Sequence, residues 1–303
     1  MKFMYAGDVI ECAQVLSLPR AADLRSPDTS LEIRQVDTLS AFPERTFVSR
    51  GLMLGNEWSL GRCASGSTWT FAMPPLAHCQ MSADGSELSI ETPLTSNDAL
   101  LGELIVSWIL VYRLAALGRP TFHGSAIEVE PGRAVAVFGP SNSGKSSAAI
   151  ALCSAGGKLI SDDVVAIEFG NDDVIRVGAT SSSIAVRQEL EHHVTNEVAS
   201  YRASDGRLIA RVETALSSVA LVQLLFLTGE RGRQHTTALS GPLAVAQLIA
   251  NSKMVTWVDK TARAAEFDAA CEVADRVPAV ALTPPDLTLR GGADALRSLV
   301  LYR

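Results

Sequence analysis

The chain has 303 residues, of which 47% are hydrophobic and 19% charged, as in a folded globular protein with an ample core. Its formal net charge of −7 argues against a nucleic-acid partner bound through phosphate contacts. The five cysteines (Cys12, Cys63, Cys79, Cys153 and Cys271) form no Cys-x-x-Cys pair. They predict neither a disulfide framework nor a structural zinc, and they suit a reducing cytoplasm.

Residues 1–95 predict a small β-rich N-terminal region, because short, partly alternating apolar segments are separated by turn residues. Ala83-Asp84-Gly85 is a hairpin-type turn. The first residues lack the long apolar segment of a signal peptide, so we expect none. His78 and Cys79 are adjacent and would face opposite sides of a strand, which makes a metal pair a poor interpretation.

The most hydrophobic run, residues 100–117, is expected to be a core helix that is N-capped at 96–98 and ends at Gly118. Glu103 and Arg113 leave only nine uncharged residues between them, too few to cross a bilayer. We therefore expect no membrane partner and a cytoplasmic location. The domain expected to carry the chemistry runs from this helix to the end, over residues 96–303.

Residues 139–146 match the phosphate-binding pattern Gly-x-x-x-x-Gly-Lys-Ser/Thr. An apolar segment, 133–138, predicts a buried strand before it, and helix-forming residues, 146–153, follow it. A glycine loop between strand and helix directs backbone N–H groups at a phosphate. Lys145 would reach the β- and γ-phosphates of a nucleotide, and Ser146 would bind Mg²⁺. The expected nucleotide-binding residues are Gly139, Pro140, Ser141, Asn142, Ser143, Gly144, Lys145, Ser146 and Ser147.

Two polar sites flank this loop. His123 precedes an expected strand, 126–129, whose partner strand leads into the loop, so it is either near the phosphates or structural. Asp162 and Asp163 lie between apolar residues, where two like charges require an offsetting cation or proton. Mg²⁺ shared with Ser146 would meet that need, and one carboxylate could accept a hydroxyl proton. The alternative for the pair is a solvated turn.

Further elements follow along the chain. Strands are expected over 174–177, 183–186, 219–227 and 278–282, and helices over 241–250 and 262–275. The polar stretch 189–211 is expected to be a surface loop, which either receives substrate or is a solvated excursion.

His123-Gly124-Ser125-Ala126, the loop 139–146 and the segment 156–163, in this order and spacing, resemble the catalytic domain of HPr kinase/phosphorylase. The resemblance implies an α/β fold: a P-loop core of mixed β-sheet with helices, similar to phosphoenolpyruvate carboxykinase, rather than a doubly wound sheet. It also implies ATP, Mg²⁺ and transfer to a serine hydroxyl. The implied catalytic residues are His123, Lys145, Asp162 and Asp163, and the implied metal residues are Ser146, Asp162 and Asp163. Asp163 is favoured as the base and Asp162 as its metal-side or orienting partner, although the order could be reversed.

The chain departs from that family in places. Ser147 stands where the family usually has Glu, and no downstream metal-binding glutamate stands out. The later catalytic arginine has four candidates: Arg187, Arg211, Arg231 and Arg233. A small β-rich leader joined directly to the core is more similar to HPr kinase-like proteins encoded with peptide-modification pathways, including kinases of lasso-peptide precursors.

The resemblance therefore implies a serine kinase that acts on a peptide or small protein, with ATP and Mg²⁺ as cofactors. Members of the family that the chain resembles are hexameric, which implies a homo-oligomer. No interface pattern stands out in the sequence. Two alternatives stay open. One is a kinase of the same fold that phosphorylates a small-molecule hydroxyl or carboxylate. The other is a nucleotide-binding regulator without catalysis, which the missing glutamate would suit and the two aspartates argue against.

Overall fold

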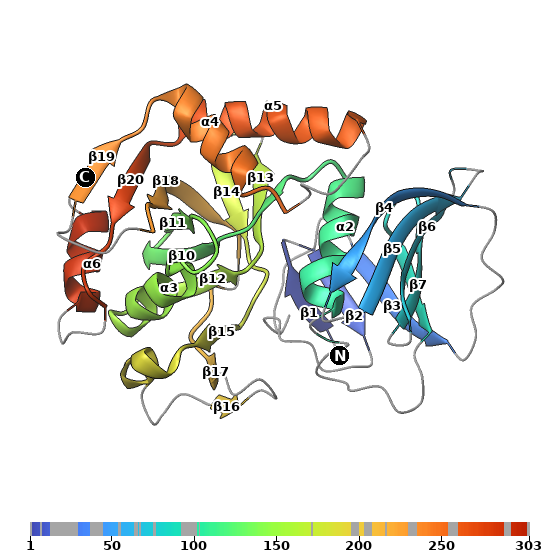
Figure 1. Ribbon diagram of the computed structural model, residues 1–303, viewed down its shortest axis with the longest axis horizontal. Helices are drawn as coiled ribbons and strands as arrows, with labels where there is room; N and C mark the ends of the chain where they lie inside the picture. The colour runs from blue at the N-terminus through green and yellow to red at the C-terminus, as the bar shows by residue number, and fades with distance from the viewer. Residues whose placement is uncertain are drawn as a thin grey trace.

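The computed structural model describes most of the chain. The described residues are 2–6, 8–12, 30–36, 45–53, 56–63, 66, 68–74, 77–91, 102, 104–170, 172–194, 200–202, 208–215, 217–229, 235–253, 260–287 and 292–301. They form two lobes, an N-terminal one built on an eight-stranded sheet and a C-terminal one built on a nine-stranded sheet with a three-stranded sheet beside it (Figure 1). No helix within these ranges is long and apolar enough to span a membrane.

The N-terminal sheet has the strand order β1-β2-β3-β8-β7-β6-β5-β4. Its strands are β1 (Lys2–Tyr5), β2 (Asp8–Cys12), β3 (Ser30–Val36), β4 (Arg45–Met53), β5 (Asn56–Cys63), β6 (Thr68–Met73), β7 (Ala77–Ser82) and β8 (Glu87–Glu91). On β7 burial alternates, so that Cys79 is buried and its neighbour His78 is partly exposed, as the alternation of a strand requires. The expected β-rich character of this region is confirmed.

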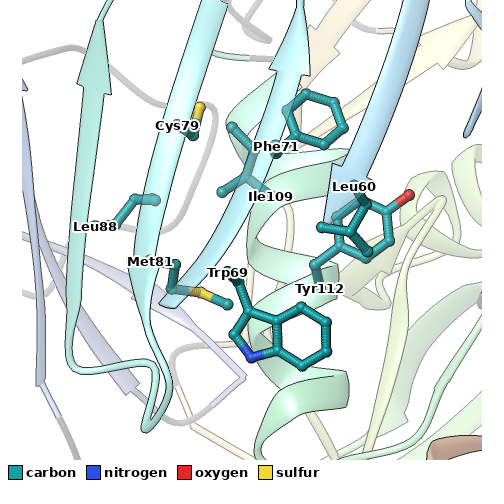
Figure 2. A pocket seen from close by; sticks show the side chains of 8 residues that line it. All are labelled: Leu60, Trp69, Phe71, Cys79, Met81, Leu88, Ile109 and Tyr112. Carbon is teal, nitrogen blue, oxygen red and sulfur yellow. The ribbon is translucent and has the colours of Figure 1, made fainter. Parts of the chain in front are cut away.

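One face of this sheet is covered by a helical segment, η1 (Ile105–Ile109) followed by α2 (Leu110–Ala116). Aromatic rings make the contact, with the Trp58 and Tyr112 ring centroids 6.3 Å apart. A small apolar pocket remains between sheet and helix (Figure 2), lined by Leu60, Trp69, Phe71, Cys79, Met81, Leu88, Ile109 and Tyr112. The helix ends before Gly118, whose φ of 70° suits glycine, as predicted. Its predicted cap at 96–98 lies outside the described residues.

The C-terminal sheet runs in the order β12-β10-β11-β18-β14-β13-β9, and β20 pairs with both β18 and β19. Its strands are β9 (Thr121–Phe122), β10 (Ser125–Glu130), β11 (Arg133–Phe138), β12 (Lys158–Asp162), β13 (Val165–Phe169), β14 (Ile175–Gly178), β18 (Val219–Leu227), β19 (His235–Ala238) and β20 (Ala279–Thr283). The β11–β18 and β18–β20 pairs are parallel, whereas the other pairs among these nine strands are antiparallel. This mixed sheet confirms the α/β expectation and differs from a doubly wound sheet.

Helices cover both faces of this sheet. The α3 helix (Lys145–Ser154) packs with α6 (Gly292–Leu301) in one apolar cluster, and α4 (Gly241–Ala250) packs with α5 (Lys260–Arg276) in another. Figure 1 shows α4 and α5 on the side opposite α3. Each cluster buries one face of a sheet whose central strand, β18, is apolar along nearly its whole length. The sheet thereby gives the loop between β11 and α3 a rigid base.

The stretch 189–211, expected to be a loop, is partly regular, and that expectation is wrong for three segments of it. It contains most of η2 (Gln188–His193) and two strands, β16 (Ser200–Arg202) and β17 (Leu208–Arg211). The β17 strand pairs with β15 (Ser183–Val186) and β16 to make the three-stranded sheet. Pairing with β15, distant in sequence, supplies the backbone hydrogen bonds that a local polar pattern does not predict.

The two lobes share a hydrophobic cluster. It joins Tyr5 and the η1–α2 segment to Val164 and Ala166, which lie in and after the loop that follows β12. Backbone bonding also crosses between the lobes, because the Ala6 N–H donates to the Ala179 carbonyl at 2.7 Å. The division of the chain between residues 95 and 96 stays a prediction, since both lie outside the described residues.

Candidate active site

The loop between β11 and α3 turns in a way that only glycine permits at its first residue. Gly139 has a φ of 145°, and a Cβ there would lie 2.7 Å from Ser143 Oγ and 2.8 Å from the Leu227 carbonyl oxygen. Gly144, at φ 100°, is the N-cap of α3. No acidic side chain occupies the first turn of α3, all of whose residues are described. The positive end of the helix is therefore available to an anion at this loop.

Lys145 folds back into the curve of this loop. Its ammonium donates to the carbonyl oxygens of Gly139, at 2.9 Å, and Pro140, at 3.1 Å. Burial lowers the pKa of Lys145, while the nearby charges of Asp163 and Asp162 act in the opposite direction. The positive charge thus lies at the loop, and its neutral carbonyl partners can be replaced by a charged phosphate oxygen.

A buried hydroxyl adds to this cradle. Ser143 Oγ is inaccessible to water and has no hydrogen-bond partner among the described residues. Because a buried hydroxyl without a partner is costly, a ligand that accepts its hydrogen bond would stabilise the loop. The glycine turn, the ammonium group and this hydroxyl together fit the phosphate groups of a nucleotide.

Asp162 faces the beginning of α3. Its Oδ1 accepts hydrogen bonds from Ser125 Oγ, at 2.7 Å, and from Ser146 Oγ, at 3.0 Å. Burial raises the pKa of Asp162 to about 6, the Ser125 hydrogen bond opposes that rise, and the charge of Asp163 adds to it. A hydroxyl and a carboxylate at one place are the hard oxygen ligands that Mg²⁺ prefers, with phosphate oxygens completing its shell. The described residues contain no group of three or more His, Cys, Asp or Glu side chains that would hold a metal by themselves.

Asp163, the next residue, faces a different set of partners. Its Oδ2 pairs with Lys253 Nζ at 2.6 Å, and its Oδ1 lies 3.4 Å from His123 Nε2. Asp163 has a φ of 79°, which is uncommon for a residue with a side chain. The turn at Asp163 therefore directs two consecutive carboxylates to two different sides of the site.

His123 reaches the site through a close approach of two strands. At Gly124 a Cβ would lie 2.6 Å from the Phe138 ring and 2.7 Å from the Val137 carbonyl oxygen, so glycine is required beside the histidine. Burial lowers the pKa of the half-buried His123, and the charge of Asp163 raises it. The structure thus brings His123, Lys145, Asp162 and Asp163 together around one loop.

The remaining residues predicted for this site have simpler positions. Pro140, Ser141 and Asn142 are exposed at the tip of the loop, and Ser147 is half-buried on α3. Arg187 donates from Nη2 to Asn142 Oδ1 at 2.7 Å, so this arginine lies at the loop. Arg211 is exposed on β17, while Arg231 and Arg233 lie outside the described residues.

Sequence reasoning missed two residues at this site, Asn251 and Lys253. Asn251 Oδ1 accepts a hydrogen bond from the Gly139 N–H at 3.2 Å, and Lys253 pairs with Asp163. Both follow the predicted helix 241–250, about one hundred residues beyond the loop, and belong to no recognisable motif. In the sequence, only their position directly after the end of a predicted helix could have pointed to them.

No family model matches the chain. The chain is 29% identical over 111 residues to an HPr kinase/phosphorylase of Lachnoclostridium phytofermentans (strain ATCC 700394 / DSM 18823 / ISDg). The matched residues make up 35% of this chain and 36% of that protein. The chain thus spans about a third of the length of this curated relative. The structure of the Hpr(Ser) kinase/phosphatase from Coxiella burnetii matches 59% of this chain and 93% of its own, at 12% identity and a TM-score of 0.30.

The fold and the loop geometry define a P-loop protein with a mixed α/β core. The similarity to the Lachnoclostridium protein supports an HPr kinase-like family, which is the resemblance drawn from the sequence.

Proposed function

We propose that this protein is an ATP- and Mg²⁺-dependent kinase that transfers the γ-phosphoryl group to a serine hydroxyl of a peptide or small protein. The observation that carries the proposal is that the two adjacent carboxylates, Asp162 and Asp163, have different partners. Asp162 bonds to Ser146 at the start of α3, whereas Asp163 faces His123. One carboxylate is thus available to a metal beside the phosphates, and the other to an acceptor.

The phosphate loop would hold the nucleotide. The amides around Gly144, the Ser143 hydroxyl and the Lys145 ammonium are the groups that would bind its phosphates. Ser146 and Asp162 would hold Mg²⁺, with Asp163 next to them, as the oxygen donors at this place favour. The bound ion would supply positive charge against the transferring phosphoryl oxygens.

The chemistry of the acceptor falls to Asp163 and His123. The acceptor oxygen forms a bond to the γ-phosphorus while the bond from that phosphorus to the bridging oxygen breaks, and ADP leaves with the electron pair. The acceptor proton passes to the Asp163 carboxylate. His123 Nε2, 3.4 Å from Asp163 Oδ1, orients that carboxylate. Lys145 stabilises the negative charge that develops on the phosphate oxygens of the ADP leaving group.

The choice of a peptide serine as acceptor rests on the resemblance to HPr kinase-like proteins of peptide-modification pathways. A small-molecule acceptor would use the same four residues. We expect labelled phosphate to pass from γ-labelled ATP to a peptide and to remain on serine after partial hydrolysis. Transfer to metabolites alone would replace the peptide with a small-molecule acceptor.

Two substitutions test the mechanism. Lys145→Ala and Asp163→Asn are expected to reduce transfer at least 100-fold while the circular dichroism spectrum is unchanged, and Asp163→Asn is expected to keep nucleotide binding. Undiminished transfer in both variants would refute the mechanism. Tight binding of ATP without turnover for any acceptor would favour a regulator instead.

A further inference from the structure

Of three consecutive residues after α4, the first and the third contact the candidate site. We call these residues, Asn251, Ser252 and Lys253, the α4 end segment. Asn251 accepts hydrogen bonds from the Gly139 N–H through Oδ1, at 3.2 Å, and from the His123 N–H through its carbonyl oxygen, at 2.6 Å. A single residue therefore ties the start of the phosphate loop to the histidine.

The orientation of Asn251 is set by the helix that precedes it. Its side chain is buried, and Nδ2 donates to the Gln247 carbonyl at 2.8 Å. With the amide nitrogen held by the last turn of α4, the amide oxygen points to Gly139. A buried side-chain amide that uses both of its ends has little freedom to rotate.

The rest of the segment is anchored to strand β9. Ser252 forms an antiparallel bridge with Phe122, and the Lys253 N–H donates to the Thr121 carbonyl at 3.1 Å. Ser252 Oγ donates to Glu266 of α5 at 2.7 Å. These contacts fix the backbone of Lys253, whose side chain is only 16% exposed and pairs with Asp163 Oδ2 at 2.6 Å.

The Lys253 pair decides which way Asp163 faces. Because Lys253 takes Oδ2, the other oxygen, Oδ1, is left toward His123. Asp163 also has a positive φ of 79°, a conformation that persists only where neighbouring contacts hold it. An ion pair with a largely buried lysine is such a contact.

We propose that the α4 end segment is the positioning element of this site. Asn251 sets the phosphate loop relative to His123, and Lys253 holds Asp163 in the orientation that faces His123. The inference rests on the proposed kinase function for its catalytic consequence. Neither residue needs to touch substrate for this role.

The test for Lys253 separates positioning from general stability. Lys253→Met is expected to lower kcat for phosphoryl transfer at least tenfold, with the Kd of Mg²⁺ and a non-hydrolysable ATP analogue within about twofold of wild type. Lys253→Arg keeps the positive charge. Its decrease in log kcat relative to wild type is expected to be at most half of the decrease seen in Lys253→Met. Lys158→Met is the matched control, because it breaks an ion pair of 2.7 Å with Glu213 away from the site. Equal losses in Lys253→Met and Lys158→Met would overturn the proposal.

The test for Asn251 needs no acceptor. We expect Asn251→Ala to accelerate amide hydrogen exchange at both Gly139 and His123 at least fivefold, because the side chain that orients the segment is lost. Asn251→Asp keeps the accepting oxygen and is expected to preserve protection at Gly139. Unchanged exchange in a folded Asn251→Ala protein would refute the role of Asn251. If Asn251→Ala does not fold, loss of Gly139 protection in Asn251→Asp would refute that role instead.

The kinetic and the hydrogen-exchange measurements also separate this inference from the proposed function. If no acceptor is phosphorylated by the wild-type protein, the proposed function fails. The exchange measurements, extended to residues 162–164 in Lys253→Met, still decide whether the segment positions the loop and Asp163. Faster exchange there supports positioning, and unchanged exchange refutes it.

Discussion

Ser146 and Asp162 are joined by a hydrogen bond of 3.0 Å between Oγ and Oδ1, although 16 positions separate them along the chain. Ser146 lies in the first turn of α3, and Asp162 is the last residue of β12. The bond brings the positive end of a helix and the end of a strand to one point. The proposed metal site depends on this relationship.

The first prediction concerns the metal. Asp162→Asn is expected to remove most of the Mg²⁺-dependent increase in nucleotide affinity, because an amide is a far weaker ligand for a hard cation than a carboxylate. Calorimetric titration of a non-hydrolysable ATP analogue with and without Mg²⁺ measures the effect. Asp172→Asn is the control, since Asp172 is exposed in the turn before β14. An equal Mg²⁺ effect in Asp162→Asn and wild type would contradict the assignment.

The second prediction concerns pH and stability. Burial raises the pKa of Asp162 from 3.8 to about 6, so the folded protein holds this proton more tightly than the unfolded chain. Ionising Asp162 therefore costs stability as the pH rises from about 4 to about 6, and the cost is complete above that range. Asp162→Asn removes the cost, so it should be more stable than wild type at pH 7, by on the order of 1–2 kcal/mol after allowance for partial exposure.

Denaturant unfolding without Mg²⁺ at pH 4 and pH 7 measures this difference. The gain from Asp162→Asn should be much smaller at pH 4, where the folded carboxyl is protonated and the unfolded one, with its ordinary pKa of 3.8, is only partly ionised. A gain that is the same at both pH values would show that ionisation of Asp162 is not its cause.

The third prediction concerns the phosphate loop itself. Gly139→Ala should destabilise the protein by about 1–3 kcal/mol and abolish nucleotide binding, because the new Cβ meets the Leu227 backbone as well as Ser143 Oγ. Gly132→Ala is the control, since Gly132 also has a positive φ, 77°, but nothing lies within 4 Å of the new Cβ. Thermal unfolding and analogue binding compare the two. Similar losses in both variants would assign the effect to φ alone.

The fourth prediction concerns the arginine. The resemblance implies a catalytic arginine, and of the four candidates Arg187 is the one that the structure describes at the loop, through Asn142. Arg187→Ala should lower kcat/KM for phosphoryl transfer at least tenfold, because a cation near transferring phosphates stabilises their charge. Arg211→Ala, on an exposed position of β17, should have little effect. The reverse order of effects would exclude Arg187.

Several elements could be predicted because their information is local. The strands at 183–186 and 219–227 and the helix at 241–250 match β15, β18 and α4 in both bounds. Each is an apolar run bounded by turn residues or begun by Gly-Pro, so neighbouring residues alone determine its extent. The phosphate loop is equally local, because its glycines, lysine and serine all lie within residues 139–146.

The contacts that organise the candidate site arise differently. Lys253 meets Asp163 across 90 positions and Asn251 meets Gly139 across 112, and no spacing rule connects such residues. Likewise, strand β17 pairs with β15, and β16 pairs with β17 in turn. Strand pairing and helix packing bring these distant groups together, since buried backbone and polar groups must find hydrogen-bond partners wherever the chain returns. Local pattern therefore accounts for the loop and its strand, and long-range pairing accounts for what surrounds them.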